Sequence, residues 1–247
     1  MAQKIVVLIL CKKFNEYSDR LSSYLQERGI PAVLIYDYHQ GYEAEDKNML
    51  AAGYVDLTLG KHIKKPSAWD KAFYFIKDKL SFYEYVYFIE DDVYCSKLET
   101  FYELITHDEK SACDLLTHHM CFKELSLSWP HWHVADSLGI KNQVYSFNPL
   151  CRLSARLIKK VLEERDLRLR FIFHEILFAP LAVNNNFEVK QYCSNDTSGM
   201  FGRFGAVLKF TKEEINSGKI IHPIKPIYQD ESICEVEDKQ RSLPHPA

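Results

Sequence analysis

A short apolar segment that ends in three consecutive acids is the feature that most constrains the fold of this chain. Residues 85–89 read Tyr-Val-Tyr-Phe-Ile and are followed at once by Glu90, Asp91 and Asp92. Because both faces of the segment are apolar, it predicts a strand buried near the centre of a parallel or mixed sheet. Binding sites of such sheets lie beyond the carboxyl ends of the strands, which is where these acids fall.

The three acids repel one another unless something offsets their charge. Two like charges about 4 Å apart cost about 4 kcal/mol at an effective dielectric constant near 20. A hard divalent cation with oxygen ligands is the simplest way to offset that cost. The alternatives are that an acid caps the amphipathic helix predicted near 98–105, or that the acids face solvent in a loop.

Strand and helix signals alternate along the chain and predict an α/β fold. In the first half, strands are expected over 5–10 and 31–36, helices over 16–28 and 66–80, and weaker helix and strand signals at 46–52 and 54–59. In the second half, strands are expected over 114–117, 144–153 and 187–192, with 118–142 irregular. Helices are expected over 154–165 and 171–183, the latter broken near Pro180, and a short helix after Thr211. We therefore predict a Rossmann-type mixed sheet flanked by helices in a single domain.

The predicted domain covers residues 1–228, followed by a polar tail over 229–247. Residues up to about 110 are expected to bind a nucleotide, and those from about 111 to 228 an acceptor. No block of Lys and Arg stands out and the formal net charge is −3, which argues against nucleic acid as a partner.

Cysteine usage and apolar run lengths predict a cytoplasmic protein without a membrane span. The seven cysteines are scattered and odd in number, so we expect reduced thiols. The apolar run at Ile5–Leu10 is too short for a signal peptide, and no run approaches the roughly 18 residues of a transmembrane helix.

The segment after the first strand argues against the common nucleotide-binding loops. Residues 11–15 read Cys-Lys-Lys-Phe-Asn, without the glycines of a dinucleotide fingerprint or a P-loop. A Rossmann-type fold without these loops must neutralise phosphate charge in another way. A metal ion held by carboxylates at the end of a central strand does so.

A strand followed by Glu90-Asp91-Asp92 resembles the DXD signature of GT-A-fold glycosyltransferases, including small stand-alone domains found in bacteria and large DNA viruses. The resemblance extends in element order from the first strand to about Lys225. It implies Mn²⁺ or Mg²⁺ as cofactor and a nucleotide-sugar donor, a UDP-sugar rather than a GDP-sugar. It also implies transfer of a hexose to a saccharide or glycoconjugate acceptor.

The same resemblance implies roles for individual residues. Asp92 is the expected direct metal ligand and His222 the distant one, while Glu90 or Asp91 would bind ribose or a metal-bound water. The alternative for His222 is a histidine in a proline-rich turn. The further expected donor contacts are Cys11 near the base, Asp37 near the base or ribose, and Lys71 and Lys225 at the phosphates, with ordinary solvated lysines as the alternative.

Glu175 is the candidate catalytic base. It follows His174 inside the apolar segment 171–178, where a carboxylate is costly unless it is paired or lines a cavity. Burial would raise its pKa, as suits a base that deprotonates an acceptor hydroxyl in an inverting transferase. The alternative is a carboxylate paired with Arg168 or Arg170, and a retaining enzyme would not need this base.

The segment 113–133 is rich in His, Cys and Trp. Its potential zinc ligands, Cys113, His118, His119 and Cys121, have a spacing that fits no structural zinc pattern. An acceptor loop is the better interpretation: Trp129 and Trp132 would stack on a sugar ring, and His131 or His133 would bind its hydroxyls. The alternative is that the two tryptophans belong to the core.

Three other functions compete with transfer. A nucleotidyltransferase that makes nucleotide-sugars usually carries a glycine-rich loop after its first strand, which this chain lacks. A metal phosphohydrolase usually needs an acidic nucleophile at the first strand or a His cluster near the acids. A catalytically silent sugar-binding module would bind nucleotide without turnover.

Overall fold

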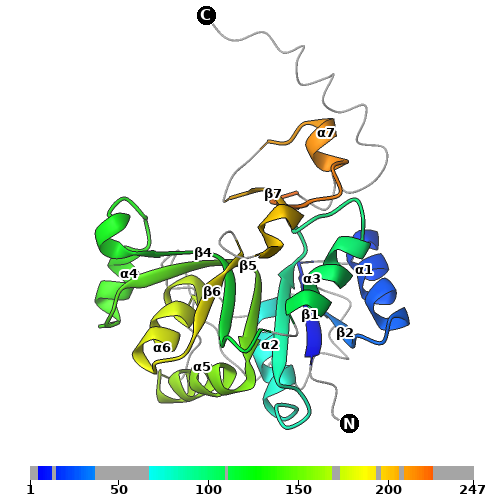
Figure 1. Ribbon diagram of the computed structural model, residues 1–247. Helices are drawn as coiled ribbons and strands as arrows, with labels where there is room; N and C mark the ends of the chain where they lie inside the picture. Colours follow the sequence, from blue (N-terminus) through cyan, green and yellow to red (C-terminus); the bar gives the residue numbers. More distant parts are fainter. Residues whose placement is uncertain are drawn as a thin grey trace, which may run out of the picture.

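A computed structural model of the chain describes residues 5–12, 15–36, 67–108, 111–168, 173–192, 196–205 and 209–224 (Figure 1). The helix expected at 46–52, the strand expected at 54–59 and the tail expected at 229–247 lie outside these ranges.

A six-stranded mixed sheet forms the body of the fold, with strand order β2-β1-β3-β5-β4-β6. Its strands are β1 (Ile5–Cys11), β2 (Ala32–Tyr36), β3 (Tyr85–Glu90), β4 (Leu115–Phe122), β5 (Val144–Ser154) and β6 (Val189–Gln191). β1 is parallel to β2 and β3, β5 is antiparallel to β3 and β4, and β6 is parallel to β4 at the edge. A small second sheet pairs β7 (Phe201–Phe204) with β8 (Ile220–His222).

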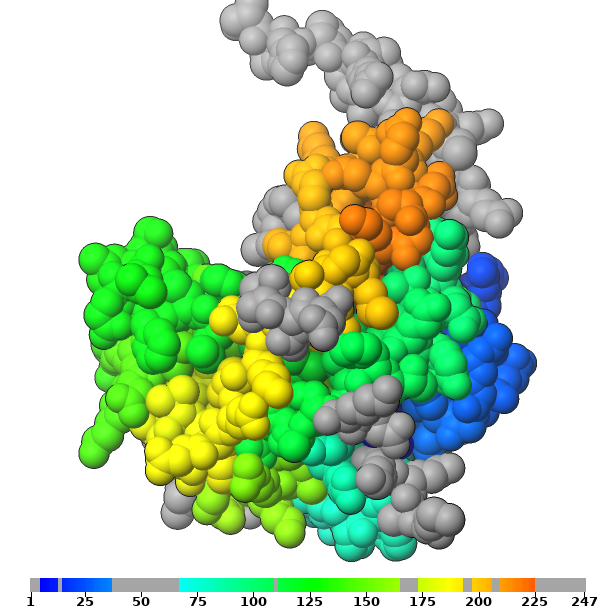
Figure 2. Space-filling model, in the orientation of Figure 1, coloured from blue at the N-terminus to red at the C-terminus, as the bar shows by residue number. Residues whose placement is uncertain are grey.

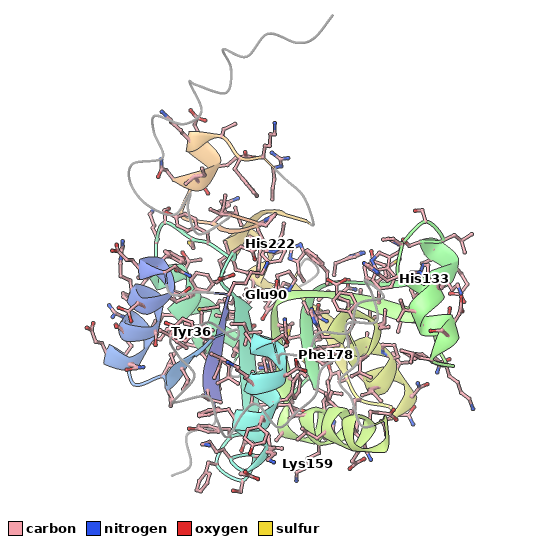
Figure 3. All side chains as sticks on the ribbon, turned by 180° about the vertical axis from the view of Figure 1, so that it is seen from behind. Tyr36, Glu90, His133, Lys159, Phe178 and His222 are labelled. Carbon is pink, nitrogen blue, oxygen red and sulfur yellow. The ribbon has the colours of Figure 1, made fainter. Side chains whose placement is uncertain are left out.

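Helices cover both faces of the large sheet. The α-helices are α1 (Glu16–Glu27), α2 (Ala68–Lys77), α3 (Glu99–Asp108), α4 (Trp132–Ser137), α5 (Ala155–Arg168), α6 (Phe178–Asn184) and α7 (Lys212–Ile215). Short 3₁₀ turns are η1 (Lys123–Leu125), η2 (His174–Ile176) and η4 (Asp196–Met200). α2, α5 and α6 pack on one face and α1 and α3 on the other, so the predicted mixed sheet flanked by helices is confirmed (Figures 1 and 3).

β3 lies at the centre of the sheet because both of its faces are apolar. Val86 and Phe88 enter the core under α2 and α5, and Tyr87 and Ile89 enter the core under α1 and α3. All four side chains are at most 1% exposed. Burial of each large apolar side chain contributes about 1.5–3 kcal/mol, which holds the acids that follow at a fixed place.

The sequence-based boundaries fail mainly around β4. This strand continues to Phe122 and α4 follows, whereas residues 118–142 were expected to be irregular. β5 is 11 residues long, and its first half finds hydrogen-bond partners only if β4 extends, as in the pair Phe122↔Val144. A register shift between Thr117 and His119 marks a bulge within β4, a device that re-aims side chains near binding sites.

Pro180 does not break a helix, contrary to expectation. The segment 171–183 is not one helix: η2 comes first, and α6 starts at Phe178. Pro180 therefore stands in the first turn of α6, where a missing backbone N–H removes no helical hydrogen bond.

The described ranges also show the state of five cysteines and the length and polarity of the helices. Cys11, Cys95, Cys113, Cys121 and Cys151 are free thiols. Within the same ranges, every helix is too short or too polar to cross a membrane.

Candidate functional site

The three acids at the carboxyl end of β3 have two different environments. Glu90 is the last residue of β3, and Asp91 and Asp92 form the turn that follows it. Glu90 and Asp92 line one cavity, which Asp91 does not line. The Asp91 carboxylate accepts a hydrogen bond from the backbone N–H of Lys12 at 2.9 Å, and its own N–H donates to the carbonyl of Leu10 at 2.9 Å. Asp91 thereby ties the carboxyl end of β1 to that of β3.

His222 reaches the acids because β8 docks beside the residues that follow them. Tyr94 and Ile221 exchange two backbone hydrogen bonds, of 2.9 and 2.8 Å. The N–H of Ile224 donates to the carbonyl of Asp92 at 2.7 Å. These bonds place the imidazole next to the acids, and Figure 3 shows His222 just above Glu90 at the upper end of the strands.

Glu90, Asp92 and His222 form a group suited to a divalent cation. One ligand atom from each lies within 4.8 Å of the others, and the described residues contain no second group of this kind. His222 Nδ1 is 2.7 Å from the carbonyl oxygen of Gly205, which only accepts, so Nδ1 carries a hydrogen. Such a bond orients the other nitrogen toward a metal.

The contact between His222 and Asp92 supports the same assignment. Nε2 lies 3.1 Å from Asp92 Oδ1. This is the distance of an ion pair between a protonated ring and the carboxylate, or of two ligand atoms that share one cation. Two carboxylates and one imidazole are a donor set that Mn²⁺ accepts.

Burial adds to the cost of the negative charge in this group. The pKa of Glu90 is raised, first by burial and then by the nearby Asp92. The indole N–H of Trp69 donates to Glu90 Oε1 at 2.9 Å and offsets part of this rise. Strong perturbation of a carboxyl in a cavity is typical of a functional site.

The group opens into a cavity of about 760 Å³, within the usual range for small-molecule sites. In Figure 2 the surface is hollowed between the green lobe with α4 and the orange segment with α7 and β8. The cavity is lined by Glu90, Asp92, His118, His119, Trp129, Pro130, His131, Tyr145, Phe147, Pro149, Phe173, His174, Glu175, Phe204, Gly205, His222 and Pro223.

Glu175 lines this cavity from η2. Its side chain is half-buried, and low-polarity surroundings, with a smaller contribution from the charge of Glu90, raise its pKa to about 8. Burial raises the pKa of Tyr145, with smaller contributions from Cys121 and from the charge of Glu175. Glu175 therefore shares this cavity with the acids and with Tyr145. Arg170 and the side chain of Arg168 lie outside the described part of the chain.

The two tryptophans that were expected to stack on a sugar, Trp129 and Trp132, have different environments. Trp129 lines the cavity and stacks on Tyr145 with ring centroids 4.6 Å apart and an interplanar angle of 7°. Trp132 is 5% exposed, and its N–H donates to the Ser126 carbonyl at 2.6 Å, so it belongs to the core and the stacking prediction is wrong for it. His131 lines the cavity, whereas His133 is exposed on α4 (Figure 3).

The potential zinc ligands do not come together in one group. The Cys113 sulfur contacts the guanidinium of the buried Arg152 at 3.1 Å, while His118 and His119 face the cavity. Burial, with the neighbouring His119 and His222, lowers the pKa of His118 to about 4.

The remaining predicted donor contacts lie away from the cavity or outside the described ranges. Cys11 is buried at the end of β1, and Lys71 is only 1% exposed within α2; neither lines the cavity. Asp37 and Lys225 lie outside the described residues.

Two supporting residues were missed from the sequence. Trp69 contacts Glu90. The sequence signal that could have pointed to Trp69 was the capping box of Ser67 and Asp70, which places this tryptophan in the first turn of α2. Gly205 supports His222 through its backbone carbonyl, which leaves no trace in a side-chain pattern.

Comparisons with known proteins give structural likenesses only. No protein-family model matches the sequence, and a search of curated proteins gives no match. One similar solved structure is a glycosyltransferase involved in the glycosylation of the major capsid of PBCV-1, with a TM-score of 0.44 and 12% identity over 94% of this chain and 98% of that one. Another is A197 from STIV, with a TM-score of 0.35 and 9% identity over 76% of this chain and 80% of that one.

Proposed function

We propose that this chain is a metal-dependent glycosyltransferase that moves a hexose from a nucleotide-diphosphate sugar, a UDP-sugar, to an uncharged saccharide or glycoconjugate. The observation that carries the proposal is a single cavity that contains both a group of potential metal ligands and a separate carboxyl group with a raised pKa. Glu90 and Asp92 meet His222 within 4.8 Å, and Glu175, with a pKa of about 8, stands apart from them.

The donor end is the group of Glu90, Asp92 and His222, which would hold Mn²⁺ or Mg²⁺. A cation bound there would neutralise the charge that grows on the leaving diphosphate. Asp91 acts outside the cavity, where its bond to the Lys12 N–H fixes the backbone at the ends of β1 and β3, the usual place for a nucleotide. Of the other predicted donor contacts, Asp37 and Lys225 stay proposals, whereas Cys11 and Lys71 are buried and do not line this cavity.

Glu175 is the proposed base. The acceptor hydroxyl oxygen attacks the anomeric carbon, the bond from that carbon to the diphosphate oxygen breaks with its electron pair, and the hydroxyl proton passes to the Glu175 carboxylate. A base works best when its pKa lies near the working pH, and burial brings the pKa of Glu175 to about 8. Attack opposite the leaving group inverts the anomeric configuration.

The acceptor end is proposed at Trp129, Tyr145 and Phe173, which line the same cavity as Glu175. Aromatic rings offer apolar faces to the C–H faces of a sugar while polar groups bind its hydroxyls. Among the described residues that line the cavity there is no Lys or Arg to pair with an anionic acceptor, which is why we propose an uncharged one.

The test is release of UDP from a panel of UDP-sugars with Mn²⁺, Mg²⁺ or EDTA. We expect slow cation-dependent release from one donor, lost in Asp92→Ala and retained in Glu163→Ala, which removes an exposed carboxylate on α5. Added neutral saccharides should accelerate release in the wild type but not in Glu175→Gln.

Each proposed part has an outcome that contradicts it. Cation-dependent nucleotide binding without turnover would assign a binding module. Release that is unaffected by Asp92→Ala would refute the donor end, and acceleration by a saccharide in Glu175→Gln would refute the base.

A further inference from the structure

Trp69 connects the cation group to the segment that carries Glu175. Its indole N–H donates to Glu90 Oε1 at 2.9 Å. Its ring lies on the His174 ring, with centroids 4.1 Å apart and planes 20° apart. One side chain of α2 therefore contacts both a candidate metal ligand and the residue that precedes the candidate base.

The Trp69 ring is held in place by its own neighbours. Phe88 of β3 stacks at 5.2 Å and 20°, and Phe178 of α6 contacts it edge-on at 5.8 Å. The backbone is fixed as well, because Ser67 and Asp70 form a complete capping box at the start of α2. A side chain held this way loses little further freedom when its neighbours bind a ligand.

The hydrogen bond from Trp69 restricts the Glu90 carboxylate. An indole N–H is a donor only, so its bond to Oε1 restricts rotation of the Glu90 carboxyl group about the last side-chain bond. Bonds of this kind to a metal ligand keep it oriented, and their loss typically weakens metal binding by about 10- to 100-fold.

The stacking contact restricts η2. His174 is half-buried, and desolvation lowers its pKa to about 3, so an uncharged ring faces Trp69. The His174 carbonyl also accepts a hydrogen bond from Asn148 on β5 at 3.4 Å. Because Glu175 is the next residue of the same turn, these contacts fix its backbone relative to β3 and β5.

We infer that Trp69 is a positioning residue: its N–H orients Glu90 for a divalent cation, and its ring fixes η2 so that Glu175 faces the same site. The inference rests on the proposed function for the role of Glu175, but its metal-binding part does not. The two parts can therefore be tested separately.

The first test measures Mn²⁺ affinity without nucleotide, by the loss of the free-ion electron paramagnetic resonance signal. The variant is Trp69→Phe, which keeps an aromatic ring and removes the N–H. The matched control is Trp132→Phe, which also removes a buried N–H, in this case one bonded to the Ser126 carbonyl. We expect affinity about 10- to 100-fold weaker in Trp69→Phe and unchanged in the control, with similar melting temperatures.

Equal Mn²⁺ affinity in Trp69→Phe and wild type would overturn the inference, as would a wild type that binds no Mn²⁺. A wild type that binds Mn²⁺ but releases no UDP from any donor would refute the transferase, while the affinity comparison still decides the role of Trp69 toward Glu90. For an active enzyme, Trp69→Phe at saturating Mn²⁺ should recover most of its kcat, whereas Trp69→Ala, which also loses the stack on His174, should not.

Discussion

Glu175 should make the protein less stable as the pH rises, and Glu175→Gln should remove this effect. The pKa of Glu175 is about 8 in the folded chain, against an ordinary value of 4.5. Between these values the folded state keeps the proton that the unfolded state releases. Stability is therefore unaffected below pH 4.5, falls through the interval, and reaches its full loss above pH 8.

The size of the effect follows from linkage. For a shift from 4.5 to 8, the cost to the wild type is about 0.8 kcal/mol at pH 5 and about 4 kcal/mol at pH 8. The side chain is only half-buried, so solvent screening reduces this difference, and we expect a measured change of about 1–3 kcal/mol between the two pH values. Glutamine keeps the shape of the side chain and does not titrate.

Urea unfolding of the wild type and Glu175→Gln at pH 5 and pH 8 measures the difference. EDTA is included because a bound cation would lower the pKa of Glu175. We expect the variant to gain stability relative to the wild type as the pH rises, since contributions from Glu90 and other groups are common to both. A stability difference that is the same at the two pH values would refute the reasoning.

Three other predictions concern the cation group, the start of α2 and the core. His222→Ala should weaken Mn²⁺ binding at least about 10-fold in a titration, because it removes one of three ligands; unchanged affinity would exclude His222. Ser67→Ala should lower the free energy of unfolding by about 1 kcal/mol through loss of the N-cap of α2, measured by urea unfolding. Arg152→Leu should lower it by about 3 kcal/mol or more, because the carbonyls of Ser111 and Cys113 lose their buried donor; a smaller loss would show that water replaces it.

The central strand and its acids were predictable because the signal is local. A strand that is apolar on both faces must be buried, and the acids that follow it must lie at its carboxyl end. The same holds for the start of α2, where Ser67 and Asp70 form the capping box that their spacing indicates. Elements of this kind need only a few neighbouring residues to be recognised.

The rest depends on partners distant in sequence. β4 extends to Phe122 because its backbone pairs with the first half of β5. The residue types at 118–122 do not by themselves indicate this pairing. Trp129 and Trp132 look equivalent as sequence, and only packing against Tyr145 and the Ser126 carbonyl distinguishes a cavity wall from a core residue.

The cation group forms only when two segments that are distant in sequence pair with each other. Tyr94 and Ile221 make this pairing through two backbone hydrogen bonds. The large sheet forms from β1 to β6, whereas the group is complete only when β8 has docked beside the residues that follow β3. Undocked, the chain would keep Glu90 and Asp92 together without the imidazole. Cation binding and docking of β8 are therefore coupled equilibria, and an added cation should stabilise the docked form by mass action.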